Sequence, residues 1–145
     1  MAKTDATISA HELNRATLAR QMLLEREVIS PVAAVERLIG MQAQEARPPY
    51  IGLWSRVRDG SREEMVAAFA NRRLVRATLM RGTIHAFSAA DYRAFRPAIQ
   101  PVLDRSLSAL GERSAGLDLD QVLDAARTIL ATGPLPFTEI RDRLQ

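Results

Sequence analysis

Two glutamines one residue apart, Gln42 and Gln44, are the side chains whose type and spacing point most directly to chemistry. Residues two apart lie on nearly opposite sides of a helix but on the same side of an extended segment. Two amides that share one site therefore favour an extended backbone. A buried amide must find partners for its donors and acceptors. The pair accordingly predicts either a polar ligand site or a set of hydrogen bonds inside an irregular loop.

The residues around the glutamines predict the backbone that would position them. Gly40 is suited to the C′ position after a helix, and the Pro-Pro pair at residues 48–49 favours extended conformations before it. We therefore expect a turn or an extended loop over residues 40–49. Ser30 and Pro31 have the residue types of a helix start, so a helix is expected to lead into this loop.

The rest of the chain predicts a mainly α fold with a small β-hairpin. Ser61 and Glu64 form a capping box at the start of one helix. Residues 74–80 and 83–87 have the alternating character of short strands, with an Arg-Gly turn between them. Several helices joined by short turns, together with one hairpin, predict a helix-turn-helix module with a wing, that is, a winged helix.

Two domains are expected along the chain. Residues 1–112 would form the first, including the glutamine loop and the hairpin, and residues 113–145 would form a linker and the start of a second. The last helical segment stops with the chain after barely two turns, which is too short for a helix to be stable by itself. We therefore expect the 145 residues to be a fragment of a longer protein.

The composition excludes several classes of protein. With 47% hydrophobic residues, the chain is globular rather than disordered. It contains no cysteine, which excludes disulfides and thiolate chemistry and suits a reducing cytoplasm. No hydrophobic run approaches the length that spans a membrane, so we expect no membrane partner. His11 and His85 lack the spacing of a metal site and no glycine-rich phosphate loop is present, so we expect no metal, no nucleotide and no other cofactor.

Arginine is concentrated in the middle of the chain. The net charge is +3, and every basic side chain except Lys3 is arginine. Between residues 47 and 81 the charged side chains are Arg47, Arg56, Arg58, Arg62, Arg72, Arg73, Arg76 and Arg81 against Asp59, Glu63 and Glu64. Because arginine forms planar, bidentate contacts with phosphate, this stretch predicts either a surface for nucleic acid or an ordinary solvated face.

Four runs of the sequence resemble the bacterial winged-helix DNA-binding family that contains the AlkZ-type DNA glycosylases. These runs are residues 13–21, 40–44, 49–54 and 75–85. The match covers most of the chain, and the runs follow the family's order. The resemblance implies a protein of tandem winged helices, of which this chain would be the N-terminal fragment. The family's motif is a Gln-x-Gln pair, and Gln42 and Gln44 occupy both positions, whereas related branches place an acidic residue second.

The resemblance also implies a reaction, the hydrolytic removal of N-alkylated or crosslinked purines from DNA. An alkylated purine is cationic and leaves readily, and positive charge develops on the sugar as the glycosidic bond breaks. Amide oxygens can stabilise that charge and hold a water for attack, so Gln42 and Gln44 are the predicted catalytic residues. The residues predicted to contact DNA are Arg47, Arg76, Arg81, Thr83 and His85. The expected partner is double-stranded DNA carrying alkylated bases, and the expected location is the cytoplasm, in association with the nucleoid.

A second function is consistent with the same residues. A winged-helix protein can bind DNA without acting on it, as a transcriptional regulator or a toxin-resistance protein, because fold does not determine function. A single histidine on a strand, such as His85, is more often packed or hydrogen-bonded than catalytic. The two functions differ in one property, which is whether the glutamine pair is needed to release a base.

Overall fold

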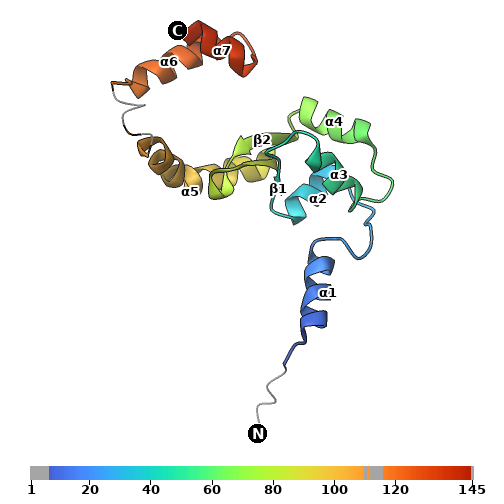
Figure 1. Cartoon of the computed structure of the whole chain (residues 1–145). Helices are drawn as coiled ribbons and strands as arrows, with labels where there is room; N and C mark the ends of the chain where they lie inside the picture. The colour runs from blue at the N-terminus through green and yellow to red at the C-terminus, as the bar shows by residue number, and fades with distance from the viewer. Residues whose placement is uncertain (1–6, 110, 112–115, 145) are drawn as a thin grey trace. The chain divides into compact units, whose positions relative to one another are not determined.

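A computed structural model of the chain describes residues 7–109, 111 and 116–144 (Figure 1). The elements are α1 (Ala10–Arg20), α2 (Pro31–Arg37), β1 (Met41–Gln42), α3 (Pro48–Trp54), α4 (Arg62–Ala70), β2 (Leu74–Thr78), the 3-10 helix η1 (Met80–Gly82), β3 (Ile84–Ser88), α5 (Ala89–Ser108), α6 (Leu119–Leu130) and α7 (Phe137–Leu144). The prediction of a mainly α chain with a small β component is confirmed. The chain divides into two compact units, Met1–Leu103 and Asp104–Gln145, called here the N-terminal and C-terminal units.

A three-stranded antiparallel sheet lies at the centre of the N-terminal unit, with strand order β1-β3-β2. The predicted hairpin is confirmed as β2 and β3, in which Val75 faces Phe87. Its turn includes Arg81, which has a positive φ of 55°. The short strand β1 was expected only as extended backbone; it joins the other side of β3, where Gln42 faces His85. The glutamine motif therefore belongs to the sheet and not to a separate loop.

Helices cover both faces of this sheet. One hydrophobic cluster joins α2, α3, α4 and β2, and its buried members are Met22, Ala34, Val35, Leu53, Val57, Met65, Ala68 and Leu74. Successive strand residues point to opposite faces, so Val75 and its partner Phe87 face away from Leu74. There the buried Phe87 ring packs edge-on against Phe95 of α5, with the ring centroids 6.3 Å apart.

The helix starts follow the local signals in the sequence. The side chain of Ser30 accepts a hydrogen bond from the Ala33 N–H at the start of α2, with Pro31 as its first residue. Ser61 and Glu64 form the predicted capping box at the start of α4. These caps satisfy main-chain donors that the first turn of a helix leaves free, and so they define where α2 and α4 begin.

The end of α2 differs from the prediction by one residue. The Ile39 N–H donates to the Glu36 carbonyl and the Gly40 N–H to the Val35 carbonyl, both at 2.9 Å, which is a Schellman motif. Ile39, with a φ of 54°, occupies the C′ position that was predicted for Gly40. Gly40 follows with a φ of +94°, and a Cβ built on it would lie 2.6 Å from the Phe87 ring. Glycine is needed there for both space and backbone conformation.

The C-terminal unit contains α6, α7 and the last turn of α5. The side chain of Asp118 caps α6 by accepting a hydrogen bond from the Gln121 N–H at 3.1 Å. The predicted boundary between residues 112 and 113 and most of the predicted linker lie outside the described residues, so the two-domain organisation stays a prediction. Of the helices in the described ranges, none combines the length and hydrophobicity that a transmembrane helix requires.

Gly40→Ala is expected to lower the free energy of unfolding by about 3 kcal/mol, because it adds a clash with Phe87 to an unfavourable positive φ. Gly82→Ala is the matched control: Gly82 also has a positive φ, of +69°, but its Cβ would meet nothing within 4 Å. It should cost about 1 kcal/mol. Urea unfolding followed by circular dichroism measures both values, and equal losses would show that the Phe87 contact does not constrain Gly40.

Candidate functional site

The two glutamines flank a buried residue on the edge of the sheet. Gln42 and Gln44 are exposed, whereas Ala43 between them is fully buried. The alternation is that of an extended chain, in which residues two apart share a side. The predicted extended backbone at the motif is therefore confirmed.

The hydrogen-bond ladder between β1 and β3 changes just after Gln42. In a hydrogen-bonded antiparallel pair, two facing residues exchange both main-chain bonds. The Ala43 N–H donates to the Ile84 carbonyl at 2.8 Å. The Ile84 N–H, however, donates to the side-chain oxygen Oε1 of Gln44, at 3.1 Å. The Gln44 side chain thus accepts the Ile84 N–H bond that the Ala43 carbonyl would accept in a regular ladder, and strand β1 ends there.

Arg76 binds the Ala43 carbonyl, which has no partner in the ladder between β1 and β3. It lies on β2, and its guanidinium donates from Nη2 and Nε to the Ala43 carbonyl, at 2.7 and 3.3 Å. Nη2 also lies 3.5 Å from the Gln44 carbonyl. The side chain therefore links β2 to the main chain of the glutamine motif. Its predicted contact with DNA stays a prediction, and in this structure its Nε and Nη2 donors bind main-chain carbonyls of the protein.

The amide of Gln42 has a different environment from that of Gln44. Within the described residues, the Gln42 side chain forms no hydrogen bond. The sequence predicted, as one of two interpretations, that both amides bond an irregular loop; the Gln44 amide instead bonds Ile84 of strand β3, and the Gln42 amide bonds no described residue. A solvent-facing amide keeps two donors and an acceptor available for a ligand. The two glutamines are consequently unequal, and Gln42 is the one that can reach a substrate without breaking a hydrogen bond of the protein.

His85 and Thr83 are packed into the strand opposite the motif. His85 is 4% exposed, its Nδ1 lies 3.0 Å from the Thr83 carbonyl, and its ring centroid lies 5.9 Å from that of Phe87. Because a carbonyl only accepts, Nδ1 carries the proton. The Thr83 hydroxyl donates to the Met80 carbonyl at 3.2 Å. Both side chains therefore shape β3 and its turn, and their predicted contact with DNA stays a prediction.

Arg47 and Arg81 are the two predicted DNA contacts with exposed side chains that form no hydrogen bond or ion pair within the described part of the chain. Arg47 immediately precedes α3, and Arg81 lies in the turn between β2 and β3. Neither forms an ion pair with any residue in the described ranges. An exposed guanidinium can contact a phosphate without first giving up a carboxylate. The structure thus brings most of the predicted residues to one sheet, with Arg81 at its turn and Arg47 on the neighbouring helix.

A half-buried arginine, Arg56, connects the end of α3 to the end of α1. Arg56 donates to the Gln21 carbonyl at 2.8 Å and to the Gly52 carbonyl at 2.7 Å. Partial burial lowers the pKa of its guanidinium, because desolvation disfavours the charged form. The methyl carbon of Met41 occupies the space beside Gly52, so α3 also rests against the residue before Gln42.

Sequence reasoning did not single out the exposed aromatic ring on α3. Trp54 is 59% exposed, and the guanidinium carbon of Arg26 lies 4.1 Å from its ring centroid. Arg47, Ile51 and Trp54 follow one another at intervals of four and three residues, which is the spacing of one helix face. This spacing in the sequence could have predicted that the three side chains share one face.

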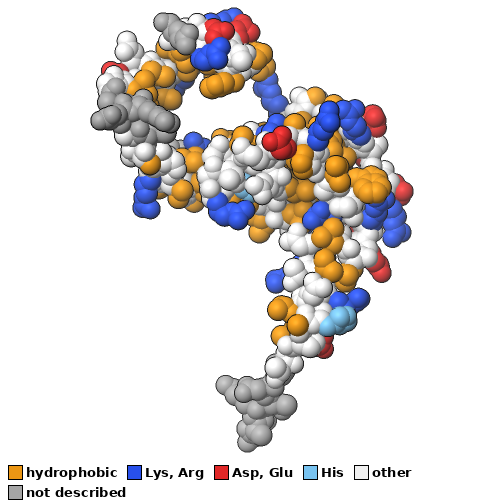
Figure 2. Space-filling view, in the orientation of Figure 1, with side chains coloured by type: hydrophobic (Ala, Val, Ile, Leu, Met, Phe, Trp, Pro, Cys, Tyr) orange, Lys and Arg blue, Asp and Glu red, His pale blue; other side chains and the backbone are white. Residues whose placement is uncertain are grey.

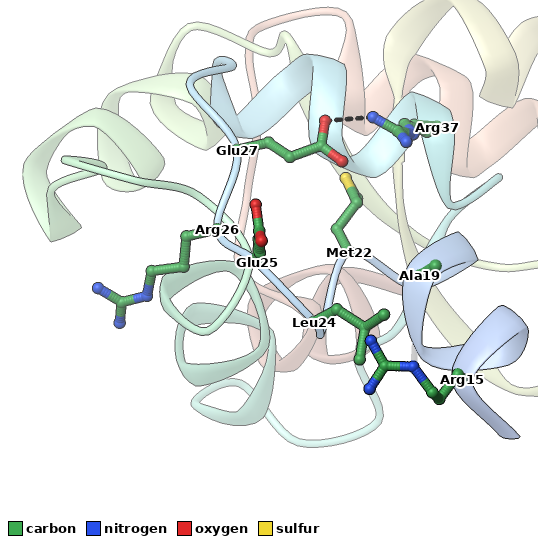
Figure 3. Close-up of a pocket in the computed structure, with 8 residues that line it drawn as sticks. All are labelled: Arg15, Ala19, Met22, Leu24, Glu25, Arg26, Glu27 and Arg37. Atoms are coloured by element: carbon green, nitrogen blue, oxygen red, sulfur yellow. Dashed lines mark hydrogen bonds and ion pairs between the residues drawn. The ribbon is translucent and has the colours of Figure 1, made fainter. Parts of the chain in front are cut away.

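A cleft of about 580 Å³ has neither glutamine of the motif in its lining, which is drawn in Figure 3. Its lining residues are Arg15, Ala19, Met22, Leu24, Glu25, Arg26, Glu27 and Arg37. Glu27 and Arg37 form an ion pair across it, and carboxylates and guanidiniums are mixed along its wall. This balance of charge favours neither a cation nor an anion. Over the described residues, no group of three or more metal-ligating side chains was found that could hold a metal ion.

Comparison with known proteins places most of the chain in one family. The model of the AlkZ-like family, described as DNA glycosylase AlkZ-like, matches residues 35–145. Among solved structures, the chain is similar to Streptomyces sahachiroi DNA glycosylase AlkZ, with a TM-score of 0.59 and 24% sequence identity over 79% of this chain. The match spans 31% of that glycosylase, less than a third of its length. No curated protein matches the chain in sequence.

Gln44→Ala is expected to lower the free energy of unfolding by about 1 kcal/mol, because it leaves the Ile84 N–H without its acceptor. Gln44→Glu keeps an acceptor at the same place and should change stability little. Gln42→Ala should also be neutral, since its side chain bonds to no described residue. Thermal unfolding measures stability, and hydrogen exchange at the Ile84 amide reports the bond directly. Unchanged exchange in Gln44→Ala would contradict the assignment.

Proposed function

The chain belongs to the AlkZ-like DNA glycosylase family, and from that membership we propose that it is part of a DNA repair glycosylase. The proposed reaction is hydrolysis of the bond between deoxyribose and an alkylated or crosslinked purine in double-stranded DNA. The observation that carries the proposal is the Gln-x-Gln motif on the sheet edge, with the Gln42 amide exposed and Gln44 tied to Ile84.

The N-terminal unit is proposed to be a winged helix. Its elements run α2, β1, α3, α4, β2, β3, and the sheet order is β1-β3-β2. In this arrangement α3 and α4 correspond to a helix-turn-helix and the hairpin of β2 and β3 to the wing. The assignment would explain why the motif lies on β1, because that strand connects α2, the first helix of the proposed winged helix, to the helix-turn-helix of α3 and α4. Location in the cytoplasm with the nucleoid would follow from DNA as the partner.

The unequal environments of the two glutamines suggest unequal roles in the reaction. The oxygen of an amide carries partial negative charge, and placed beside the sugar it would stabilise the positive charge of the transition state. Gln42 is suited to this role or to holding the attacking water, since its amide is open to solvent. Gln44 and Arg76 would act as positioning residues, because their hydrogen bonds hold the main chain on which Gln42 stands.

The non-catalytic alternative is favoured by one observation. The oxygen of Gln44 already binds the Ile84 N–H, so the motif does not present two free amides to a substrate. A protein that bound DNA through Arg47 and Arg81 would leave this bond in place. The alternative function is a winged-helix regulator or toxin-resistance protein.

Base release separates the two functions. The protein is incubated with duplex DNA that contains N7-methylguanine, and free base is quantified by chromatography. Gln42→Ala is expected to slow release by roughly 100-fold, the usual effect of removing one group that stabilises transition-state charge. Its affinity for the duplex should stay within about twofold of the wild type, since the protein's phosphate contacts are retained.

Gln121→Ala, at an exposed glutamine of α6, is the matched control and should release base at the wild-type rate. If the wild type binds the duplex but releases no base, the glycosylase proposal is rejected and the regulator is supported. If Gln42→Ala releases base normally, the role proposed for Gln42 is rejected.

A further inference from the structure

The exposed face of α3 combines a large hydrophobic surface with arginine. Ile51 is 66% exposed and Trp54 59% exposed, whereas Pro49 and Leu53 on the other side of the helix are buried in the core. Arg47 precedes the helix on the exposed side, at the same helical spacing. Over the helices of the N-terminal unit, hydrophobic and basic side chains adjoin on the surface (Figure 2). Exposing this hydrophobic area to water costs free energy, and such a surface is typical of a binding site.

The backbone holds Arg26 in place against Trp54. Glu27, next to Arg26, forms a parallel bridge with Val57, in which its N–H donates to the Arg56 carbonyl and its carbonyl accepts from the Arg58 N–H, both at 2.8 Å. The Arg26 side chain points away from the other residues of the neighbouring cleft (Figure 3). Its guanidinium covers one side of the indole at 4.1 Å. An indole has two faces, so the other can accept a second planar group.

Charge on this face suits a phosphate-bearing partner. Arg47 and Arg58 flank α3 in the sequence and are exposed, and neither forms an ion pair with a carboxylate of the described residues, although Arg58 shares a surface groove with Asp59 and Glu64. Helix α4 differs, because its first turn carries Glu63 and Glu64 against one arginine, Arg62. In a helix-turn-helix the second helix usually enters the major groove, and two carboxylates there would be repelled by phosphate. Of these two helices, α3 is therefore the better electrostatic match to DNA.

From this face we infer a nucleic-acid contact in which Trp54 stacks on an unpaired DNA base. The flanking guanidiniums of Arg47 and Arg58 would contact the neighbouring phosphates. A base inside a duplex has both faces covered by its neighbours, so only an unpaired base offers a flat face to the indole. Stacking of this kind tolerates any base, because every base has a π-face. The inference rests on the proposed function, since it takes DNA as the partner.

Trp54 is the only tryptophan of the chain, so its fluorescence reports on this contact alone. The protein is titrated with labelled oligothymidylate, and the anisotropy of the label measures binding while tryptophan emission measures stacking. We expect emission to be quenched as the single strand saturates the protein. A blunt duplex of equal length should bind through its phosphates and quench much less.

Three variants separate stacking from charge. Trp54→Leu is expected to weaken binding of the single strand about tenfold, and Arg26→Lys, which keeps the charge but loses the planar group, a few-fold. Both should leave duplex affinity within about twofold. Phe137→Leu removes a ring that is 80% exposed on α7 and should change nothing. Circular dichroism confirms folding, which exposed substitutions should preserve.

The outcomes distinguish this inference from the function it rests on. If anisotropy shows binding while tryptophan emission is unchanged and Trp54→Leu binds normally, the stacking contact is rejected and the proposed function stands. The same holds if emission is already blue-shifted and insensitive to DNA, because protein would then cover the face. If no DNA binds at all, both proposals are rejected.

Discussion

The antiparallel pairing of β1 with β3 is the contact on which the candidate site depends. A strand of two residues is a weak element, and a slip of one residue would turn Gln42 inward and expose Ala43. Two side chains reinforce the register: Gln44 binds the Ile84 N–H, and Arg76 binds the Ala43 carbonyl. The side of the strand on which Gln42 stands is therefore decided by side chains from the motif itself and from β2, together with the ladder.

The packing around β3 extends this constraint to the helices. Phe87 lies between the backbone of Gly40 and the ring of Phe95, so the end of α2, the central strand and α5 share one contact. On the other side, Met41 rests against Gly52 of α3. The glutamine motif thus lies between two tightly packed glycines, Gly40 before it in the sequence and Gly52 after it. Packing of this kind holds the main chain of the motif in place without a ligand.

Local signals in the sequence were sufficient for the starts of α2 and α4 and for the hairpin, but not for strand β1 or for the roles of the side chains. Capping residues predicted the starts of α2 and α4, and alternation predicted the hairpin, because each depends on neighbours in the chain. The bond from Ile84 to Gln44 joins residues 40 apart, and that from Arg76 to Ala43 joins residues 33 apart. Local spacing carries no information about such pairs. The prediction that Gly40 occupies the C′ position of α2 was wrong for the same reason. The need for glycine at residue 40 comes from Phe87, which lies on a distant strand.

The way strand β1 ends also affects whether another chain can pair with this edge of the sheet. An edge strand offers unpaired main-chain groups to which another chain can add, and this is a common route to aggregation. Here the edge is two residues long, and the carbonyl that follows is already bound by a guanidinium. Side-chain capping of this edge keeps the catalytic candidate solvent-facing and denies a foreign strand a continuous template. The hydrogen bonds that end β1 therefore also shorten this edge of the sheet.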